Sequence, residues 1–332
     1  MNTRHFAAPT GNGYLLAFAA AGLFSIKAIF IKLAYRHGVD VETFILLRML
    51  LALPFYLAIL ALLKRGGEWR PVSPPLLATT AVLGFCSYYL ASLLDLHGLR
   101  YISANFERLI LYLYPTMVLF LGWIFLRKPV APKQLLCILG AYCGIFLIYW
   151  QDTAFGTDAA APPAVPLQPI TWGALLTALA ALSFAIYVTF SEGAIKRLGS
   201  RQFTALAMMA ASIAIAVHFA LQGNASRLDQ PLPVYGYALV VAFVCTVVPS
   251  LMMSAAIERI GSAATGAVGT SGPVVTLIAA AWVLGEPFTV YHLVGMVVII
   301  GSLVLLKRAG DSGKVRPAAG VQGGPLLNGW RG

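Results

Sequence analysis

The sequence predicts an all-α integral membrane protein with ten transmembrane helices in two inverted five-helix repeats. Of its 332 residues, 59% are hydrophobic and 11% are charged, and the mean hydropathy is +0.82. Soluble domains carry about 25% charged residues. The net charge of +11 is therefore interpreted by side of the membrane rather than as a sign of nucleic-acid binding. Ten apolar runs and a constant offset between the two halves of the chain carry the rest of the prediction.

Ten apolar runs are each long enough to cross a hydrocarbon core, which takes about 20 residues. They lie at approximately 14–35, 43–63, 75–97, 102–126, 133–150, 171–191, 202–221, 234–256, 262–284 and 289–307. The first run follows a short tail, residues 1–13, without a convincing cleavage site, so we expect it to be a retained helix. The four cysteines lie inside apolar runs without CxxC spacing, so neither a metal site nor a disulfide framework is indicated.

A Pro-rich segment at 151–170, QDTAFGTDAAAPPAVPLQPI, lacks periodicity and is predicted to be an external linker. It separates a first repeat at 14–150 from a second at 171–307. The Gly-rich residues 308–332 are predicted to form a disordered cytoplasmic tail.

The two repeats match without gaps at an offset of 158 or 159 positions. Pro115 falls on Pro273, and Phe44 falls on Phe203. A constant offset over several helices indicates duplication. Since each repeat has an odd number of helices, the second copy must be inverted in the membrane.

The basic residues agree with an inverted arrangement that has both termini in the cytoplasm. With that orientation, 16 of the 23 Lys and Arg residues fall on the cytoplasmic side and 3 on the outside. The positive-inside rule predicts such a bias. We therefore expect a multi-pass protein of the cell (inner) membrane.

Five charged residues interrupt the apolar runs of the first repeat. Lys27, Arg48, Asp95, Glu107 and Arg108 all fall roughly 5–14 Å from the outer edge of the membrane, at 1.5 Å per helical residue. Intramembrane charges usually face a pathway or pair with one another. Both readings stay open: ion pairs that lock the bundle, or groups that line a wet substrate cavity.

Neighbouring side chains diverge on a helix. We therefore predict that Glu107 pairs with Lys27 and Arg108 with Asp95, leaving Arg48 and a net charge near +1. Lys27, Arg48 and Arg108 would attract an anionic substrate group, and Glu107 would bind an amine or carry a proton.

The remaining candidates are aromatic or lie on the fourth helix of each repeat. Tyr88 and Tyr112 are candidate stacking residues, although packing roles are common for such side chains. The stretch GAVGTSGP at 266–273 predicts either close helix packing or an interrupted helix that touches substrate. In the second case Thr265, Gly269 and Ser271 join the substrate site. Pro115 and Pro273 are then the hinge positions.

Several motifs together resemble the EamA type of the drug/metabolite transporter superfamily. They are SANFERLILYLYP at 103–115, SAATGAVGTSGP at 262–273, WVLGEP at 282–287 and LLRMLLA at 46–52. The resemblance covers roughly residues 14–307. It implies inverted repeats around a central cavity and alternating-access export or exchange of small polar or amphipathic metabolites, such as amino acids or organic acids, with a substrate and lipid as partners.

Three rival functions were weighed against a secondary transporter. A channel or a purely structural membrane protein fits the spans but does not require a duplicated fold. GTSG at 269–272 and His292 resemble an intramembrane serine protease, yet a helical rise separates Ser271 from His292 by roughly 18 Å. No phosphate-binding motif indicates ATP-driven transport. We therefore expect no enzyme, cofactor or metal, with proton coupling and a homodimer left open.

Overall fold

The computed structural model describes residues 10–111, 113–126, 132–155, 167–222, 225–269, 272–285 and 289–312. Every regular element in these ranges is helical. The helices before the linker are α1 (Thr10–Ser25), α2 (Lys27–Tyr35), α3 (Val41–Arg65), α4 (Pro74–Gly84), α5 (Ala91–Gly98), α6 (Ala104–Leu111), α7 (Tyr114–Leu126) and α8 (Pro132–Phe155). Those after it are α9 (Leu167–Leu198), α10 (Ser200–Leu221), α11 (Leu232–Ala242), α12 (Val248–Gly269), α13 (Gly272–Ala279) and α14 (Val290–Ser312).

Four short segments have other helical geometry. Three are π-helical, η1 (Phe85–Leu90), η3 (Phe243–Val247) and η4 (Ala280–Leu284), and η2 (Ala225–Leu228) is a 3₁₀ turn. Segment η1 joins α4 to α5, and η3 joins α11 to α12, without a gap. Helix α12 itself is kinked at Gly261, where φ is 79°. Single π turns within α-helices are often functional, and both η1 and η3 line the cavity described below.

Seven helical stretches within the described ranges are long and apolar enough to cross a membrane. They are Asn12–Tyr35, Val41–Arg65, Pro74–Gly98, Ala104–Phe125, Pro169–Leu198, Ser200–Leu221 and Leu232–Gly261. The predicted spans at 133–150, 262–284 and 289–307 are helical in their described parts but are not among these seven. An integral membrane fold is therefore observed, and the number of ten spans stays a prediction.

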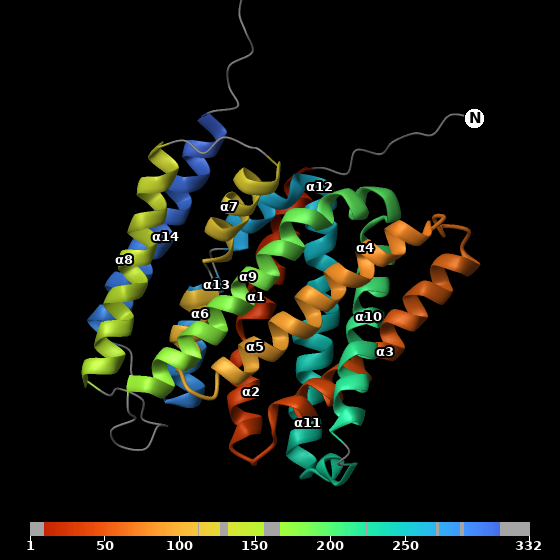
Figure 1. Ribbon diagram of the computed structural model, residues 1–332, viewed down its shortest axis with the longest axis horizontal. Helices are drawn as coiled ribbons and strands as arrows, with labels where there is room; N and C mark the ends of the chain where they lie inside the picture. The colour runs from red at the N-terminus through yellow and green to blue at the C-terminus, as the bar shows by residue number, and fades with distance from the viewer. Residues whose placement is uncertain are drawn as a thin grey trace, which may run out of the picture.

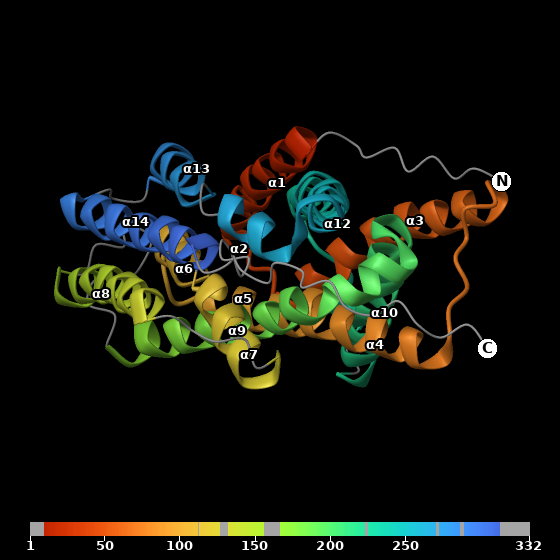
Figure 2. The same ribbon diagram turned by 90° about the horizontal axis from the view of Figure 1, so that it is seen from above.

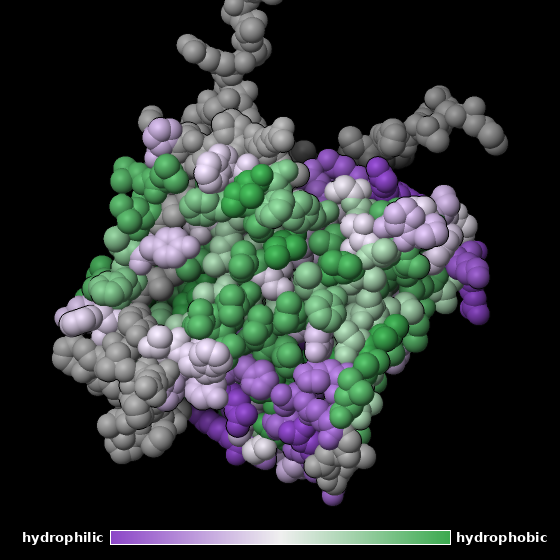
Figure 3. Space-filling view, viewed as in Figure 1, coloured by the Kyte–Doolittle hydropathy of each residue, from purple (hydrophilic) through white to green (hydrophobic). Residues whose placement is uncertain are grey.

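The exterior has the polarity that a bilayer requires. Figure 3 shows a broad hydrophobic band between polar groups at the lower and the upper right edges. Large apolar side chains such as Leu221 and Trp282 are 82% and 91% exposed. Such exposure is unfavourable in water but not in lipid.

The packing is antiparallel around a central bundle. Helices α8 and α14 lie side by side at one end of the molecule in both views (Figures 1 and 2), and α3 packs on α10. The start of α3 is tied to the end of α10, because Arg227 Nε lies 3.6 Å from Asp40 Oδ2. Beyond the other end of α3, Arg70 and Gln202 exchange two hydrogen bonds of 2.9 Å. Helices α3 and α10 therefore run in opposite directions.

Glycines allow the closest helix contacts. A Cβ placed on Gly84 of α4 would lie 2.1 Å from the carbonyl oxygen of Ala207 on α10. On α8, a Cβ on Gly144 would lie 2.8 Å from the carbonyl oxygen of Gly295 on α14. Small residues that let backbones meet are typical of membrane helix interfaces.

Candidate functional site

A cavity lies among the helices, between α1, α2, α3, η1, α5, α6, α7, α9, η3 and α12. Its volume is about 130 Å³. One water needs roughly 10–15 Å³ by this measure, so the cavity holds several waters or one small molecule. Its lining consists of Ala21, Phe24, Lys27, Arg48, Ser87, Tyr88, Ala91, Ser92, Asp95, Arg108, Leu111, Tyr114, Ala180, Phe184, Tyr187, Cys245, Thr246 and Met253.

The basic end of the cavity contains a close ion pair. Lys27 Nζ donates to Asp95 Oδ2 at 2.6 Å, and both side chains are largely buried. Lys27 is the first residue of α2, directly after Ile26, the single turn residue that separates α2 from α1. The break between α1 and α2 therefore places this ammonium group next to α5.

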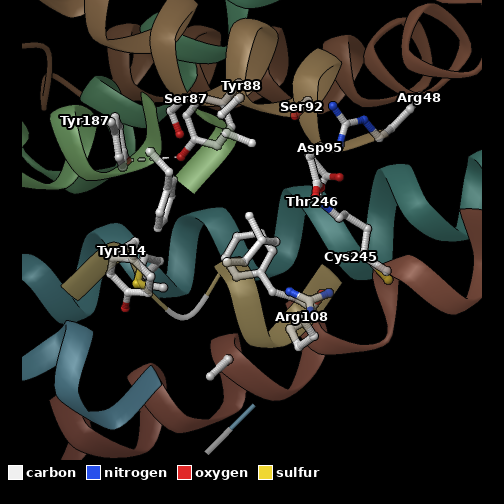
Figure 4. A pocket seen from close by; sticks show the side chains of 18 residues that line it. Arg48, Ser87, Tyr88, Ser92, Asp95, Arg108, Tyr114, Tyr187, Cys245 and Thr246 are labelled. Carbon is white, nitrogen blue, oxygen red and sulfur yellow. Dashed lines mark hydrogen bonds and ion pairs between the residues drawn. The ribbon is translucent and has the colours of Figure 1, made fainter. Parts of the chain in front are cut away.

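Arg48 is the cation whose hydrogen bonds are least complete. Its side chain projects from α3, is 3% exposed and extends toward Asp95 (Figure 4). The Nε and Nη2 atoms are both buried and find no acceptor among the described residues. These two nitrogens form one edge of the guanidinium, the edge that can hold both oxygens of a carboxylate. Arg48 also lines the cavity, so an unpaired pair of buried donors lies beside it.

The predicted partners of Glu107 and Arg108, namely Lys27 and Asp95, are wrong. Lys27 binds Asp95 rather than Glu107, and Arg108 does not bind Asp95 but donates to the carbonyl oxygens of Phe24 at 2.9 Å and Ser25 at 3.2 Å. A helix that ends leaves carbonyls without partners, and Arg108 satisfies those at the end of α1. Its Nε also lies 3.7 Å from Glu107 Oε2, so the two neighbours do contact each other.

Glu107 lies behind the cavity instead of in it. Its side chain is fully buried, and its carboxyl group interacts with the carboxyl group of Asp95 and the guanidinium group of Arg108. It is absent from the cavity lining among the described residues. A direct contact between Glu107 and a bound molecule is therefore not supported by its position.

The opposite end of the cavity is aromatic. Tyr88 and Tyr187 meet edge to face with centroids 5.5 Å apart, and their hydroxyl groups hydrogen-bond at 3.1 Å. Phe184 stacks on Tyr187 at 5.8 Å and meets Tyr114 edge to face at 5.1 Å. Figure 4 places Tyr88, Tyr114 and Tyr187 on the side away from Arg48 and Asp95. Of these four rings, Tyr88 and Tyr114 can be named from the sequence as candidate stacking residues, whereas Phe184 and Tyr187 cannot.

The fourth-helix candidates of the second repeat lie elsewhere or outside the described residues. Thr265 is buried, but its hydroxyl donates to the carbonyl oxygen of Gly261 at 2.8 Å and does not line the cavity. Gly269 is the last residue of α12. Tyr112 and Ser271 lie outside the described residues. Among the residues of 262–284 whose side chains the structure describes, none lines the cavity.

The two hinge candidates follow interruptions of the helical pattern. Pro115 is the second residue of α7, and Pro273 is the second residue of α13. Helix α6 ends at Leu111 and α12 at Gly269. Proline is well tolerated in the first turn of a helix, where its missing N–H is not needed.

Sequence reasoning missed the residues that α9 and η3 bring to the site. Phe184, Tyr187 and Thr246 stand in apolar runs where nothing marks them as different from packing residues. The repeat offset supplied one signal, because Cys245 and Thr246 correspond to Ser87 and Tyr88. Within the described ranges, no group of three His, Cys, Asp or Glu side chains is arranged to hold a metal.

A family model and two curated relatives agree that the chain is similar to transporters. The family model of the EamA-like transporter family matches residues 11–150 and 171–308. The chain is similar to the uncharacterized transporter YcbK of Bacillus subtilis (strain 168), with 28% identity over 286 residues, 82% of this chain and 85% of the relative. It is 25% identical to the uncharacterized transporter YyaM of the same organism over 220 residues, 66% of this chain and 69% of the relative.

A solved structure described only as the crystal structure of a protein has the same overall fold. The TM-score is 0.60 at 15% sequence identity, with 91% of this chain and 98% of the solved chain covered. Because the family model accounts for most of the sequence on both sides of the linker, this chain belongs to the EamA-like transporter family.

Proposed function

We propose that this membrane transporter is a secondary carrier of small metabolites that bear a carboxylate, by alternating access around the cavity described above. The observation that carries the proposal is the unpaired Nε and Nη2 edge of Arg48, a buried residue that lines the cavity. Leaving buried donors without an acceptor costs about 1–3 kcal/mol, and more for a charged group. A bound carboxylate removes that cost through two charge-assisted hydrogen bonds.

The surrounding charges favour an anion. Lys27, Arg48 and Arg108 line the cavity with a single acid, Asp95, among its described lining residues. If Glu107, which lies behind the cavity lining, is counted as ionised, these five side chains together have a net charge of +1. An anion that enters this low-dielectric space gains more from the residual positive charge than it would in water.

The recurrence of element bounds supports two related halves. Helix α4 and segment η1 begin at Pro74 and Phe85, and α11 and η3 begin 158 positions later, at Leu232 and Phe243. Likewise α7 begins at Tyr114 and α13 at Gly272. Such agreement is expected if each half folds in the same way.

The contacts support an inverted relation with the cavity between the halves. Helices α3 and α10, which the offset of 159 relates, pack on each other and run in opposite directions. The related helices α8 and α14 also pack together. Three pairs of equivalent positions line the same cavity, namely Ser87 with Cys245, Tyr88 with Thr246, and Asp95 with Met253.

Polar contacts between the halves lie at both ends of α3, which is about 37 Å long at 1.5 Å per residue. At one end Asp40 contacts Arg227. At the other, Arg70 contacts Gln202, and Glu68 contacts Arg201. The exposed pair of Glu68 and Arg201 contributes about 0–1 kcal/mol, so a contact of this kind can open and close as an inverted-repeat carrier turns over.

Ligand-induced stabilisation tests the site. Purified protein is screened against carboxylates by thermal shift, since a ligand that binds the folded state raises apparent stability. Arg48→Ala should abolish the shift, and Arg48→Lys should weaken it because an ammonium lacks the bidentate edge. Arg65→Ala is the matched control, on the exposed end of the same helix. Shifts that persist in folded Arg48→Ala protein would reject the assignment.

Flux through proteoliposomes separates a carrier from a channel. A carrier transports the screened carboxylate at a rate that saturates with its concentration, because each turnover requires a conformational change. A channel instead gives a current proportional to voltage. An ohmic current carried by the same anion would replace the carrier proposal with the channel alternative.

A further inference from the structure

The two ends of the cavity differ enough in chemistry to orient a bound molecule. Lys27, Arg48 and Asp95 lie at one end, and Tyr88, Tyr114 and Tyr187 at the other (Figure 4). A symmetric dianion would place one charge among the rings, where it has no cation. The lining therefore fits a molecule with a single charged end.

The aromatic end presents ring surface rather than polar groups. The hydroxyls of Tyr88 and Tyr187 bind each other at 3.1 Å, which leaves their rings to contact a ligand. Phe184 lies between Tyr187 and Tyr114, with interplanar angles of 25° and 77° respectively. Aromatic pairs favour stacked and edge-to-face geometries of this kind, and a ligand ring can extend the series.

The acids near the cavity are already engaged. Asp95 is bound by Lys27 at 2.6 Å, and its carboxyl group also interacts with Glu107. Glu107 in turn contacts Arg108 and does not line the cavity. An ammonium group on a ligand would therefore have to displace Lys27 from Asp95, while it approached a cluster that is already positive.

The volume limits the body of the ligand. A dry cavity of about 150 Å³ accommodates a benzene ring in a protein core, and this cavity measures about 130 Å³. The space therefore limits the apolar body of the ligand to a single ring, and a carboxylate has to lie at the Arg48 end.

Resting on the proposed function, we propose that the carrier selects monocarboxylates with one apolar ring, and that it prefers them to the corresponding zwitterionic amino acids. Arg48 holds the carboxylate, and Phe184 with its neighbouring tyrosines holds the ring. Phe184 is thus a specificity-determining residue on α9, contributed by the half of the chain that carries no charge in the cavity.

Four matched compounds test the proposal on the purified full chain by thermal shift and direct titration at neutral pH. 3-Phenylpropionate carries both groups, propionate lacks the ring, 2-phenylethanol lacks the carboxylate, and L-phenylalanine adds an α-ammonium group. We expect 3-phenylpropionate to bind most tightly and each of the others to bind at least about tenfold more weakly, a difference of about 1.4 kcal/mol.

Two phenylalanines on α9 give the matched variants. Phe184→Leu should weaken 3-phenylpropionate by about tenfold and leave propionate unchanged. Phe190→Leu removes a half-buried ring that contacts Phe125 outside the cavity, at 6.0 Å, and should change neither affinity. Since each variant keeps an apolar side chain of similar volume, folding is checked by its melting temperature without ligand.

The outcomes separate this inference from the proposed function. If propionate binds as well as 3-phenylpropionate, or L-phenylalanine binds more tightly, and binding still depends on Arg48, selection for a ring-bearing monoanion is wrong while the carboxylate carrier stands. Equal loss of affinity in Phe184→Leu and Phe190→Leu also overturns the role of Phe184. If none of the four compounds binds, or binding is indifferent to Arg48→Ala, both proposals fail.

Discussion

The two halves of the chain share a backbone pattern but contribute different chemistry to the cavity. The half before the linker supplies its charged lining residues, Lys27, Arg48, Asp95 and Arg108. At the equivalent positions the other half has Ile186, Ala207, Met253 and Gly266. Its described lining residues are instead apolar, aromatic or uncharged, such as Phe184, Tyr187 and Thr246. The two halves thus supply two walls of the cavity, and among the described lining residues only the wall from the first half is charged.

The largest expected effect comes from replacing a charged residue with its counterpart. Asp95→Met introduces the side chain of position 253 and leaves Lys27 buried without its partner at 2.6 Å. Breaking a buried ion pair on one side costs about 3–5 kcal/mol. The free energy of unfolding, measured with purified protein in detergent, should fall by that amount.

The double replacement Lys27→Ile and Asp95→Met sharpens the comparison, because it gives both positions the residues of the other half. Since neither member of this ion pair is left without the other, stability should return to within about 1 kcal/mol of the wild type, as happens when ion pairs are replaced by apolar side chains. If the double variant is as unstable as Asp95→Met, the loss is not caused by the unpaired lysine.

A smaller effect is expected where the halves pack at different distances. Gly84→Ala introduces the residue found at the equivalent position, Ala242, but its Cβ would lie 2.1 Å from the backbone oxygen of Ala207. The backbone of Ala207 cannot move aside as easily as the end of a flexible side chain. Overpacking at this contact should therefore cost about 1–3 kcal/mol. The change is measured as a lower melting temperature.

Gly236→Ala is the control for that substitution in the other half. Gly236 lies within α11, and a Cβ there meets nothing within 4 Å. Since alanine favours a helix over glycine by about 0.5–1 kcal/mol, this variant should be unchanged or slightly more stable. A similar loss in both variants would show that helix packing at Gly84 is not special.

The class and the helices could be predicted from the sequence because both depend on local composition. Long apolar runs require helices in lipid. The offset of 158 between the halves also relates the start of η1 at Phe85 to the start of η3 at Phe243. The partners of Lys27 and Arg108 could not be predicted in this way. They depend on the break at Ile26, which frees carbonyl oxygens that no residue type announces. The role of Phe184 depends likewise on which face of α9 meets the cavity.

The smallest expected effect concerns how equivalent helices begin. Asp40 caps α3 by accepting from Thr43 N at 2.9 Å and Thr43 Oγ1 at 2.7 Å, whereas Gly199 stands at the same position before α10 with φ of 78°. Losing such a side-chain cap costs about 0.5–2 kcal/mol. Asp40→Ala should therefore lower the free energy of unfolding by about 1 kcal/mol, and Asp40→Asn, which can still cap, by less.

The cap of α3 should also make stability depend on pH in a way that the start of α10 does not. Burial alone would raise the pKa of Asp40, but the Thr43 hydrogen bonds and Arg227 hold it below its ordinary value. A carboxyl group with a depressed folded-state pKa stabilises fully above its unfolded pKa of about 3.9, and that contribution is lost as the pH falls through the folded pKa. The difference in unfolding free energy between wild type and Asp40→Asn should therefore shrink below about pH 4. A difference that stays constant down to pH 3 would mean that the charge of Asp40, as distinct from its capping geometry, does not stabilise the start of α3.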